Sequence, residues 1–134
     1  RRAAEAGLED SVEFLGEQST AELVTLYRRC RVFVFPSTAE TFGNPLVEAM
    51  ASGAPVACSN AAAMPEVAGD GAIFFEPGDA GDMADAIRRL LDDGAFSREM
   101  SEKALARARM FSWRRTATET IAFLKSAAER TVDR

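Results

Sequence analysis

Two glutamates eight positions apart, Glu40 and Glu48, have the side chains in this sequence that are best suited to chemistry. Carboxylates accept hydrogen bonds from hydroxyl groups, and a carboxylate near a reacting carbon can stabilise positive charge as it develops. Gly43 lies between the two glutamates, and because it has no Cβ, a ligand can approach the backbone there closely. The segment therefore suits a ligand that is rich in hydroxyl groups.

The same segment predicts the start of a helix. Asn44 is a typical N-cap residue, Pro45 is favoured at the first helical position, and Gly53 predicts the end of the helix. The first turn of a helix presents unpaired N–H groups and the positive end of the helix dipole, which together bind phosphate. Glu48 is expected within this first turn, where it would repel an adjacent phosphate and suits a neutral diol such as a ribose. Carboxylates for hydroxyls and backbone amides for phosphate fit a nucleotide-diphosphate sugar.

Each glutamate also has an ordinary structural interpretation. A glutamate in the first turn of a helix usually complements the helix dipole, and a glutamate in a loop is usually solvated. Two glutamates at this spacing occur by chance in many sequences. The pair alone is therefore weak evidence, and the elements around it decide how it is interpreted.

Short apolar runs predict the strands that position this segment. They cover residues 12–15, 32–35, 56–58 and 72–75. Glu40 and Glu48 follow the second run, so both are expected at the carboxyl end of a strand, where open α/β sheets bind their ligands. Because helical patterns alternate with these runs, the sequence predicts a parallel sheet that is covered on both faces.

The predicted helices have recognisable start signals and apolar stripes. Ser19 and Glu22 form a capping box, and Ser112 is expected to cap the last helix. Amphipathic helices follow residue 80, and Trp113 is expected to pack the last of them against the core. The predicted fold class is α/β, with a partial Rossmann-like parallel sheet of about four strands, flanking helices and a C-terminal helical tail.

Composition excludes several classes of function. With 16 basic and 21 acidic residues, a formal net charge of −5 and no long basic run, the chain is not expected to bind nucleic acid. No apolar run approaches the roughly 20 residues that cross a bilayer, and a cytoplasmic location is expected. The chain has no histidine, which excludes imidazole catalysis within it, and no metal site is expected. Cys30 and Cys58 are expected to be buried reduced thiols.

A set of ordered motifs resembles the donor-binding signature of the group 1 (family 4-type) retaining glycosyltransferases. The motifs are FVFPS at residues 33–37, ETFG at 40–43, EAMASGAPV at 48–56, PEV at 65–67, GAIFFEP at 71–77 and FSW at 111–113. The resemblance extends from about residue 8 to about residue 124, and this combination is far more specific than two glutamates. The family often has glycine where Thr41 stands, and threonine is a familiar variant there.

The resemblance implies roles for individual residues. Glu40 matches the glutamate that contacts the donor hexose near the reacting centre, so it is expected to be catalytic. Glu48 matches the glutamate that binds the ribose. The other expected donor-binding positions are a loop near the base at Gly16, the backbone at Phe42, Gly43 and Asn44 beside the sugar hydroxyls and diphosphate, and the helix start at Leu46, where amides meet phosphate.

The resemblance also implies a larger enzyme. The family has two Rossmann-like domains with the active site between them, and residues 1–134 resemble the latter part of the second, donor-binding domain. The acceptor domain, the first strands of the donor domain and the cations that neutralise the diphosphate are expected outside this chain, which alone is expected to be inactive. The implied reaction transfers a hexose-type sugar, with retention, from a nucleotide-sugar donor to a glycan or lipid-linked acceptor. No cofactor is implied.

The sequence does not determine what pairs with the edge of the predicted sheet. Residues 12–15 would be the third strand of a Rossmann order 3-2-1-4-5-6, separated by absent strands from residues 32–35. Another chain could fill this gap, the sheet could close up, or the edge could stay exposed. An exposed edge or the last helix would permit a homo-oligomer.

Two further alternatives bear on function. The chain could be a non-catalytic donor-binding or interaction module that needs a partner subunit, and peripheral membrane association of a full-length protein stays open. A sugar-nucleotide epimerase of the same architecture is disfavoured, because such enzymes rely on a histidine in this region and the chain has none.

Overall fold

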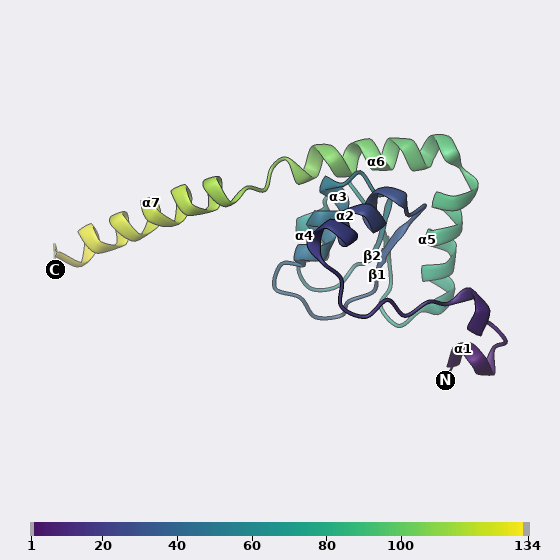
Figure 1. Ribbon diagram of the computed structural model, residues 1–134. Helices are drawn as coiled ribbons and strands as arrows, with labels where there is room; N and C mark the ends of the chain where they lie inside the picture. Colours follow the sequence, from purple (N-terminus) through teal and green to yellow (C-terminus); the bar gives the residue numbers. More distant parts are fainter. Residues whose placement is uncertain (1, 133–134) are drawn as a thin grey trace.

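Three short parallel strands form the sheet in the computed structural model, which describes residues 2–132 (Figure 1). In spatial order, the strands are β1 (Phe33–Phe35), β2 (Val56–Ser59) and β3 (Ile73–Phe75). In the register of the sheet, Phe33 pairs with Val56, and Ala57 pairs with Ile73. The α/β fold class is therefore confirmed, and these three strands lie within one residue of their predicted bounds.

Helices connect and flank the strands. They are α1 (Arg2–Glu5), the short 3-10 helix η1 (Glu9–Ser11), α2 (Thr20–Arg29), α3 (Asn44–Ala51), α4 (Met64–Ala68), α5 (Ala80–Asp92), α6 (Gly94–Ala108) and α7 (Trp113–Val132). Helix α3 links β1 to β2, and α4 links β2 to β3. Each pair of neighbouring strands is thus joined by a helical crossover, as a parallel sheet requires.

One face of the sheet packs against α3, α4 and α6. Val56 and Cys58 of β2 are fully buried on this face, together with Leu46 and Met50 of α3 and Met64 of α4. The burial of α3 against the strands fixes the position of its N-terminus relative to the end of β1.

The opposite face packs against α5 and α6. Ala57 and Phe75 of the sheet contact Ala86 and Leu90 of α5 and Met100 of α6. Because side chains alternate along a strand, Ala57 faces away from its two neighbours in β2. The sheet is therefore covered on both faces, as predicted.

The prediction that residues 12–15 form a strand is wrong. This segment has no strand structure, and within residues 2–132 it pairs with no strand. Val12 keeps an extended backbone, with φ −123° and ψ 122°, and the side chain of Phe14 is 88% exposed. A strand forms only where a neighbouring segment accepts and donates its hydrogen bonds, and no described segment does so here. The sheet has three strands instead of about four.

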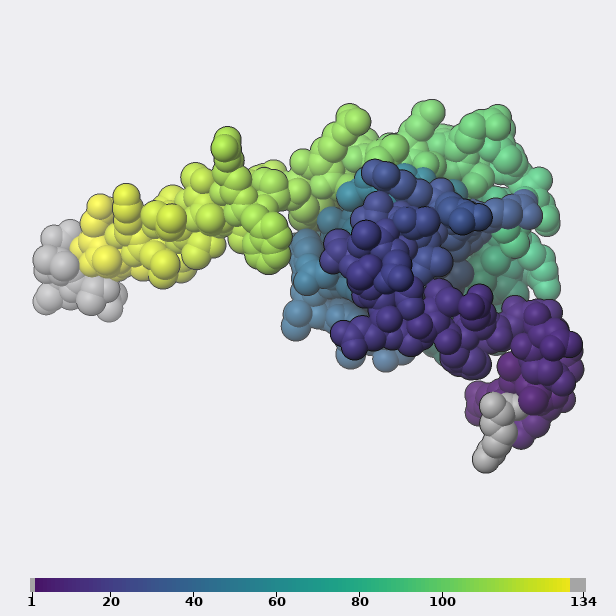
Figure 2. Space-filling model, in the orientation of Figure 1, coloured from purple at the N-terminus to yellow at the C-terminus, as the bar shows by residue number. Residues whose placement is uncertain are grey.

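Helix α7 projects from the body of the molecule as an arm (Figures 1 and 2). Its large apolar side chains face solvent, and the exposed fraction of Trp113 is 83%. The expectation that Trp113 packs the last helix against the core is therefore wrong, because α7 leaves the body at its first residue. Among the described residues, no helix is both long and apolar enough to cross a lipid bilayer.

Candidate functional site

The carboxyl ends of the three strands are tied together by hydrogen bonds. The N–H of Asn60, which follows β2, donates to the carbonyl of Phe75 in β3 at 3.0 Å. The side chain of Asn60 also donates to the Glu76 carboxylate at 2.8 Å, and the hydroxyl of Ser59 donates to the carbonyl of Ser37 after β1. These bonds join the loops that follow the strands into one edge, which is where a parallel sheet binds its ligands.

Glu40 lies at this edge, in the loop between β1 and α3, and its side chain is half-buried. The hydroxyl of Ser37 donates to Oε1 of Glu40 at 3.1 Å. Because the carbonyl of Ser37 in turn accepts the bond from Ser59, the carboxylate is connected to the buried end of β2. The structure therefore holds the predicted catalytic carboxylate in a defined position at the sheet edge.

Helix α3 begins one residue earlier than the sequence predicts. Gly43, not Asn44, is the N-cap residue, with φ 83° and ψ 61°, and Pro45 is the second helical residue. This left-handed conformation favours glycine, and a Cβ at Gly43 would lie 3.4 Å from both Met64 Sδ and Phe35 Cε1. A local structural requirement therefore explains the glycine at position 43, because it lets the chain turn sharply from the loop into the helix.

The first turn of α3 leaves few N–H groups for a ligand. Pro45 has no N–H, and the N–H of Leu46 donates to the carbonyl of Gly43 at 3.0 Å. The side chain of Leu46 is completely buried in the core, so this residue anchors the helix. Within the described chain, the backbone N–H groups of Phe42, Gly43 and Asn44 donate no hydrogen bond. They are the donors that a phosphate at this helix N-terminus would meet.

Glu48 is the fifth residue of α3, in the second turn instead of the predicted first turn. Its side chain is exposed and lies near the hydroxyl of Tyr27, a buried residue of α2. Burial raises the pKa of Tyr27 above its usual value, and the nearby Glu48 carboxylate raises it further. The Glu48 carboxylate therefore lies beside Tyr27, in the second turn of α3, and not at the helix N-terminus, where it would repel a phosphate.

Gly16 is not joined to the other predicted donor-binding residues by any described contact. It lies in the loop between η1 and α2, it is exposed, and its φ is 64°. A Cβ built on Gly16 would meet no atom within 4 Å. Glu40 and residues 42–44 therefore lie in the loop and the helix start that follow β1, whereas Gly16 lies in a separate, open loop.

An aromatic contact supports the loop that leads into α3. The rings of Phe42 and Phe111 meet edge to face, with centroids 5.4 Å apart and an interplanar angle of 79°. The guanidinium of Arg107 lies 5.3 Å from the centroid of Phe111 and donates through Nε to the carbonyl of Val67 at 2.9 Å. A second bond from Arg107 reaches the carbonyl of Glu66. The end of α6 therefore links the loop before α3 with α4.

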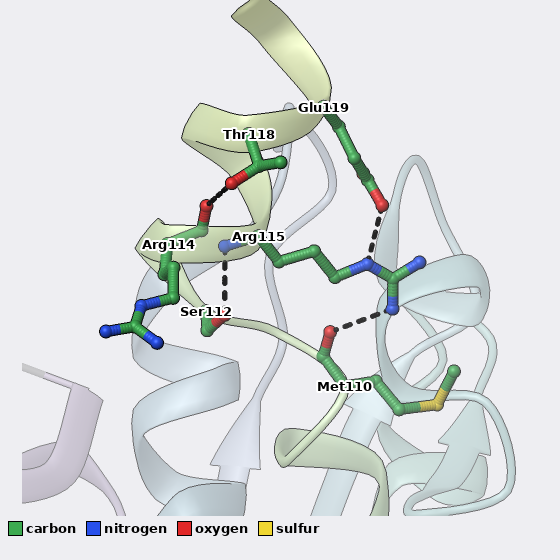
Figure 3. A network of polar contacts seen from close by, with 6 residues as sticks. All are labelled: Met110, Ser112, Arg114, Arg115, Thr118 and Glu119. Atoms are coloured by element: carbon green, nitrogen blue, oxygen red, sulfur yellow. Dashed lines mark hydrogen bonds and ion pairs between the residues drawn. The ribbon is translucent and has the colours of Figure 1, made fainter. Parts of the chain in front are cut away.

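The junction of α6 and α7 has its own polar network (Figure 3). The hydroxyl of Ser112 accepts from the N–H of Arg115 at 3.2 Å, which confirms the predicted cap of the last helix. Arg115 also donates to Glu119 at 2.7 Å and to the carbonyl of Met110 at 3.4 Å. This network fixes the direction in which α7 leaves the body immediately after Phe111.

Three residues beside the candidate site, Ser37, Ser59 and Tyr27, have little signal in the sequence. Ser37 lies in a quoted motif, and Ser59 ends an apolar run, so a polar residue at the end of a buried strand was the available signal. Tyr27 lies in an amphipathic helical pattern, where its residue type alone gives no signal of a place beside Glu48. Within residues 2–132, no group of three or more His, Cys, Asp or Glu side chains is arranged to hold a metal ion.

Comparison with known proteins identifies the family of this chain. Residues 1–107 match the family model for glycosyl transferases group 1. The chain is 38% identical over 110 residues to O-antigen chain mannosyltransferase B of Escherichia coli, which covers 82% of this chain and 29% of that protein.

Solved structures of other proteins also superimpose on this chain. Sucrose-phosphate synthase of Thermosynechococcus elongatus superimposes with a TM-score of 0.87 at 29% identity, over 96% of this chain and 33% of that one. Anabaena Alr3699/HepE in complex with UDP-glucose superimposes with a TM-score of 0.82 at 29% identity, over 94% of this chain and 35% of that one. The chain spans about a third of the length of each of these proteins. On the match of residues 1–107 to the family model, this chain belongs to the group 1 glycosyltransferases.

Proposed function

We propose that this chain is the donor-binding part of a retaining glycosyltransferase. In this proposal the enzyme transfers a hexose-type sugar from a nucleotide-diphosphate donor to a glycan or lipid-linked acceptor, in the cytoplasm. Family membership supports glycosyl transfer, and the names of similar proteins, a mannosyltransferase and a protein solved with UDP-glucose, support a nucleotide-sugar donor. The acceptor would bind a domain that lies outside these 134 residues.

The observation that carries the proposal is the arrangement at the start of α3. The carboxylate of Glu40 accepts a hydrogen bond from Ser37, the free N–H groups of residues 42–44 lie at the helix N-terminus, and Glu48 lies one turn further along the helix. A diphosphate bound to these N–H groups would gain from the helix dipole. In this proposal the Glu48 carboxylate accepts hydrogen bonds from the ribose diol, and the Glu40 carboxylate accepts one from the hexose.

Each group has a defined task in the proposed reaction. The bond between the anomeric carbon and the diphosphate oxygen breaks, and the acceptor oxygen bonds to the same face of the sugar. The acceptor proton passes to the departing phosphate oxygen. The N–H groups of residues 42–44 stabilise the charge on this leaving group, and Glu40 orients the hexose and stabilises positive charge at the reacting carbon. We propose that no cofactor takes part.

The proposal is tested by donor turnover in the full-length protein. The protein is incubated with UDP-, GDP- and ADP-sugars, and the release of nucleoside diphosphate is measured for the wild type and for Glu40→Gln. We expect release from one donor class and a loss of at least roughly a hundredfold in kcat for Glu40→Gln. Exposed Glu102 of α6 provides a matched control, Glu102→Gln, which is expected to keep the wild-type rate. Unchanged turnover in Glu40→Gln would remove Glu40 from the reaction.

A further inference from the structure

We infer that Ser37 and Ser59 are positioning residues that hold the Glu40 carboxylate in its reactive orientation. The inference rests on the proposed function, because it takes Glu40 as the carboxylate at the reacting centre. Neither serine is proposed to touch the donor. Ser59 fixes the backbone of Ser37, and Ser37 fixes the side chain of Glu40.

Ser59 is a fully buried polar residue. It is the last residue of β2, its exposed fraction is 0%, and no other polar or charged residue of the described chain is classed as buried. Its neighbours in the strand, Val56, Ala57 and Cys58, are all apolar. Alanine would fill nearly the same space without burying a hydroxyl, so packing alone does not account for a serine there.

The hydroxyl of Ser59 links β2 to the loop after β1. It donates to the carbonyl of Ser37, a residue 22 positions earlier, in the loop after β1. This bond continues the pairing of β1 and β2 beyond their last paired residues, Phe35 and Cys58. It therefore restrains the backbone from which the loop to Glu40 departs.

The carboxylate of Glu40 is held by a single hydrogen bond within the described residues. Its Oε1 accepts the Ser37 hydroxyl at 3.1 Å, and no other described residue donates a hydrogen bond to this carboxylate. Without this bond, a glutamate in a loop keeps several rotatable bonds and no fixed direction. With it, one oxygen is held by the protein and the second, Oε2, is left for a hydroxyl of the sugar. A carboxylate held in this way is already oriented toward the reacting carbon when positive charge develops there in the transition state.

The chain offers a matched control for these bonds. The hydroxyl of Ser101 in α6 donates to the carbonyl of Gly53, beyond the C-terminal end of α3, at 2.6 Å. This bond also joins two segments through a half-buried serine, but it lies at the opposite end of α3 from Glu40. Ser101→Ala therefore removes a comparable structural bond without touching the candidate site.

The experiment measures kcat and donor KM of the full-length protein together with its thermal midpoint. The variants are Ser37→Ala, Ser37→Thr, Ser59→Ala, Ser101→Ala, Glu40→Gln and the double variant Ser37→Ala with Glu40→Gln. We expect Ser37→Ala and Ser59→Ala to lower kcat roughly tenfold, with donor KM within about twofold of the wild type. Ser37→Thr keeps the hydroxyl and is expected to restore most of the rate. Ser101→Ala is expected to shift the thermal midpoint alone.

The double variant separates a positioning role from a general structural one. If Ser37 acts through Glu40, adding Ser37→Ala to Glu40→Gln costs little further rate. A wild-type kcat in Ser37→Ala, or a full additional loss in the double variant, would overturn the inference while the role of Glu40 stands. A wild-type kcat in Glu40→Gln would overturn the proposed function, and the inference with it.

Discussion

The ring of Phe42, in the loop that leads into α3, rests edge to face on the ring of Phe111, with centroids 5.4 Å apart. Phe111 lies between α6 and α7, so the candidate donor loop is supported by the last part of the chain before the α7 arm. Arg107 extends this support to α4 through its contact with Phe111 and its bond to Val67. The position of the donor loop thus depends on residues more than sixty positions away.

Removing the Phe111 ring is expected to weaken both folding and nucleotide binding. Phe111→Ala should lower the free energy of unfolding by about 1–3 kcal/mol, because it removes partly buried apolar area and an aromatic pair. Trp113→Ala is the control, since that aromatic side chain is 83% exposed. The two variants are compared by urea unfolding and by nucleotide titration. Equal effects on affinity would contradict a specific role for Phe111.

Ala62 is expected to tolerate glycine with a gain in stability. Its φ is 51°, and among the described residues it is the sole non-glycine residue with a positive φ. Glycine removes the strain of a left-handed alanine, which is about 1–2 kcal/mol. It also makes the unfolded chain more flexible, which opposes folding by about 0.4–1 kcal/mol. We therefore expect Ala62→Gly to raise the free energy of unfolding by about 0.5–1 kcal/mol.

Neighbouring Ala63 gives the opposite expectation. Its φ of −80° is unstrained and its side chain packs against the core, so Ala63→Gly should destabilise. Both variants are measured by urea unfolding. Losses of the same size in the two variants would show that Ala62 carries no strain.

Gly71→Ala is expected to destabilise the packing of α6 on the sheet. A Cβ at Gly71 would lie 2.9 Å from the Cα of Ala104 and 3.0 Å from Cε of Met50. Overpacking of this kind costs about 1–3 kcal/mol. Gly94→Ala is the matched control, because its Cβ would meet nothing within 4 Å and its φ is not positive. Urea midpoints that fall equally for both variants would contradict this close approach.

Cys58 is expected to be inert to thiol reagents in the folded protein. Burial raises the pKa of its thiol to about 12, whereas Cys30 is only half-buried. The fold favours the neutral thiol, so the contribution of this group to the free energy of unfolding is fully present below pH 9. Between pH 9 and about 12 the unfolded chain loses the proton first, so stability falls as the pH rises.

Two measurements check this expectation for Cys58. Labelling at pH 8 should modify Cys30 well before Cys58. The alkaline decline in the free energy of unfolding should be smaller in Cys58→Ala than in the wild type. Rapid labelling of Cys58 under native conditions, or equal pH slopes, would contradict its burial as the neutral thiol.

The sequence predicts those parts of the fold that local patterns determine. The three apolar runs that became strands are buried between two layers of helices, and the capping box at α2 forms both of its bonds, from Ser19 N–H to Glu22 at 2.8 Å and from Glu22 N–H to Ser19 at 3.4 Å. Residues 12–15 are apolar at three of four positions, but a strand also needs a neighbouring strand, which local sequence does not specify.

The sequence predicts which segment forms the candidate site, but it does not predict the tertiary contacts that hold this segment in place. Glu40 and the helix after it follow from the residue types, whereas the start of that helix is off by one because Gly43 caps it through its backbone conformation. This shift moves Glu48 into the second turn. The bond from Ser59 to Ser37 and the contact of Phe42 with Phe111 join residues far apart in the sequence, so they emerge only from the tertiary structure.

The most direct test of the account is titration calorimetry of the full-length protein with UDP, GDP and ADP, on the wild type, Glu48→Ala and the exposed-helix control Glu102→Ala. We expect saturable binding of one nucleotide, weakened roughly 10- to 100-fold in Glu48→Ala because the bonds to the ribose are lost, and unchanged in Glu102→Ala. Binding of no nucleotide, or equal affinity in Glu48→Ala and the wild type, would contradict the assignment of this edge as the donor site.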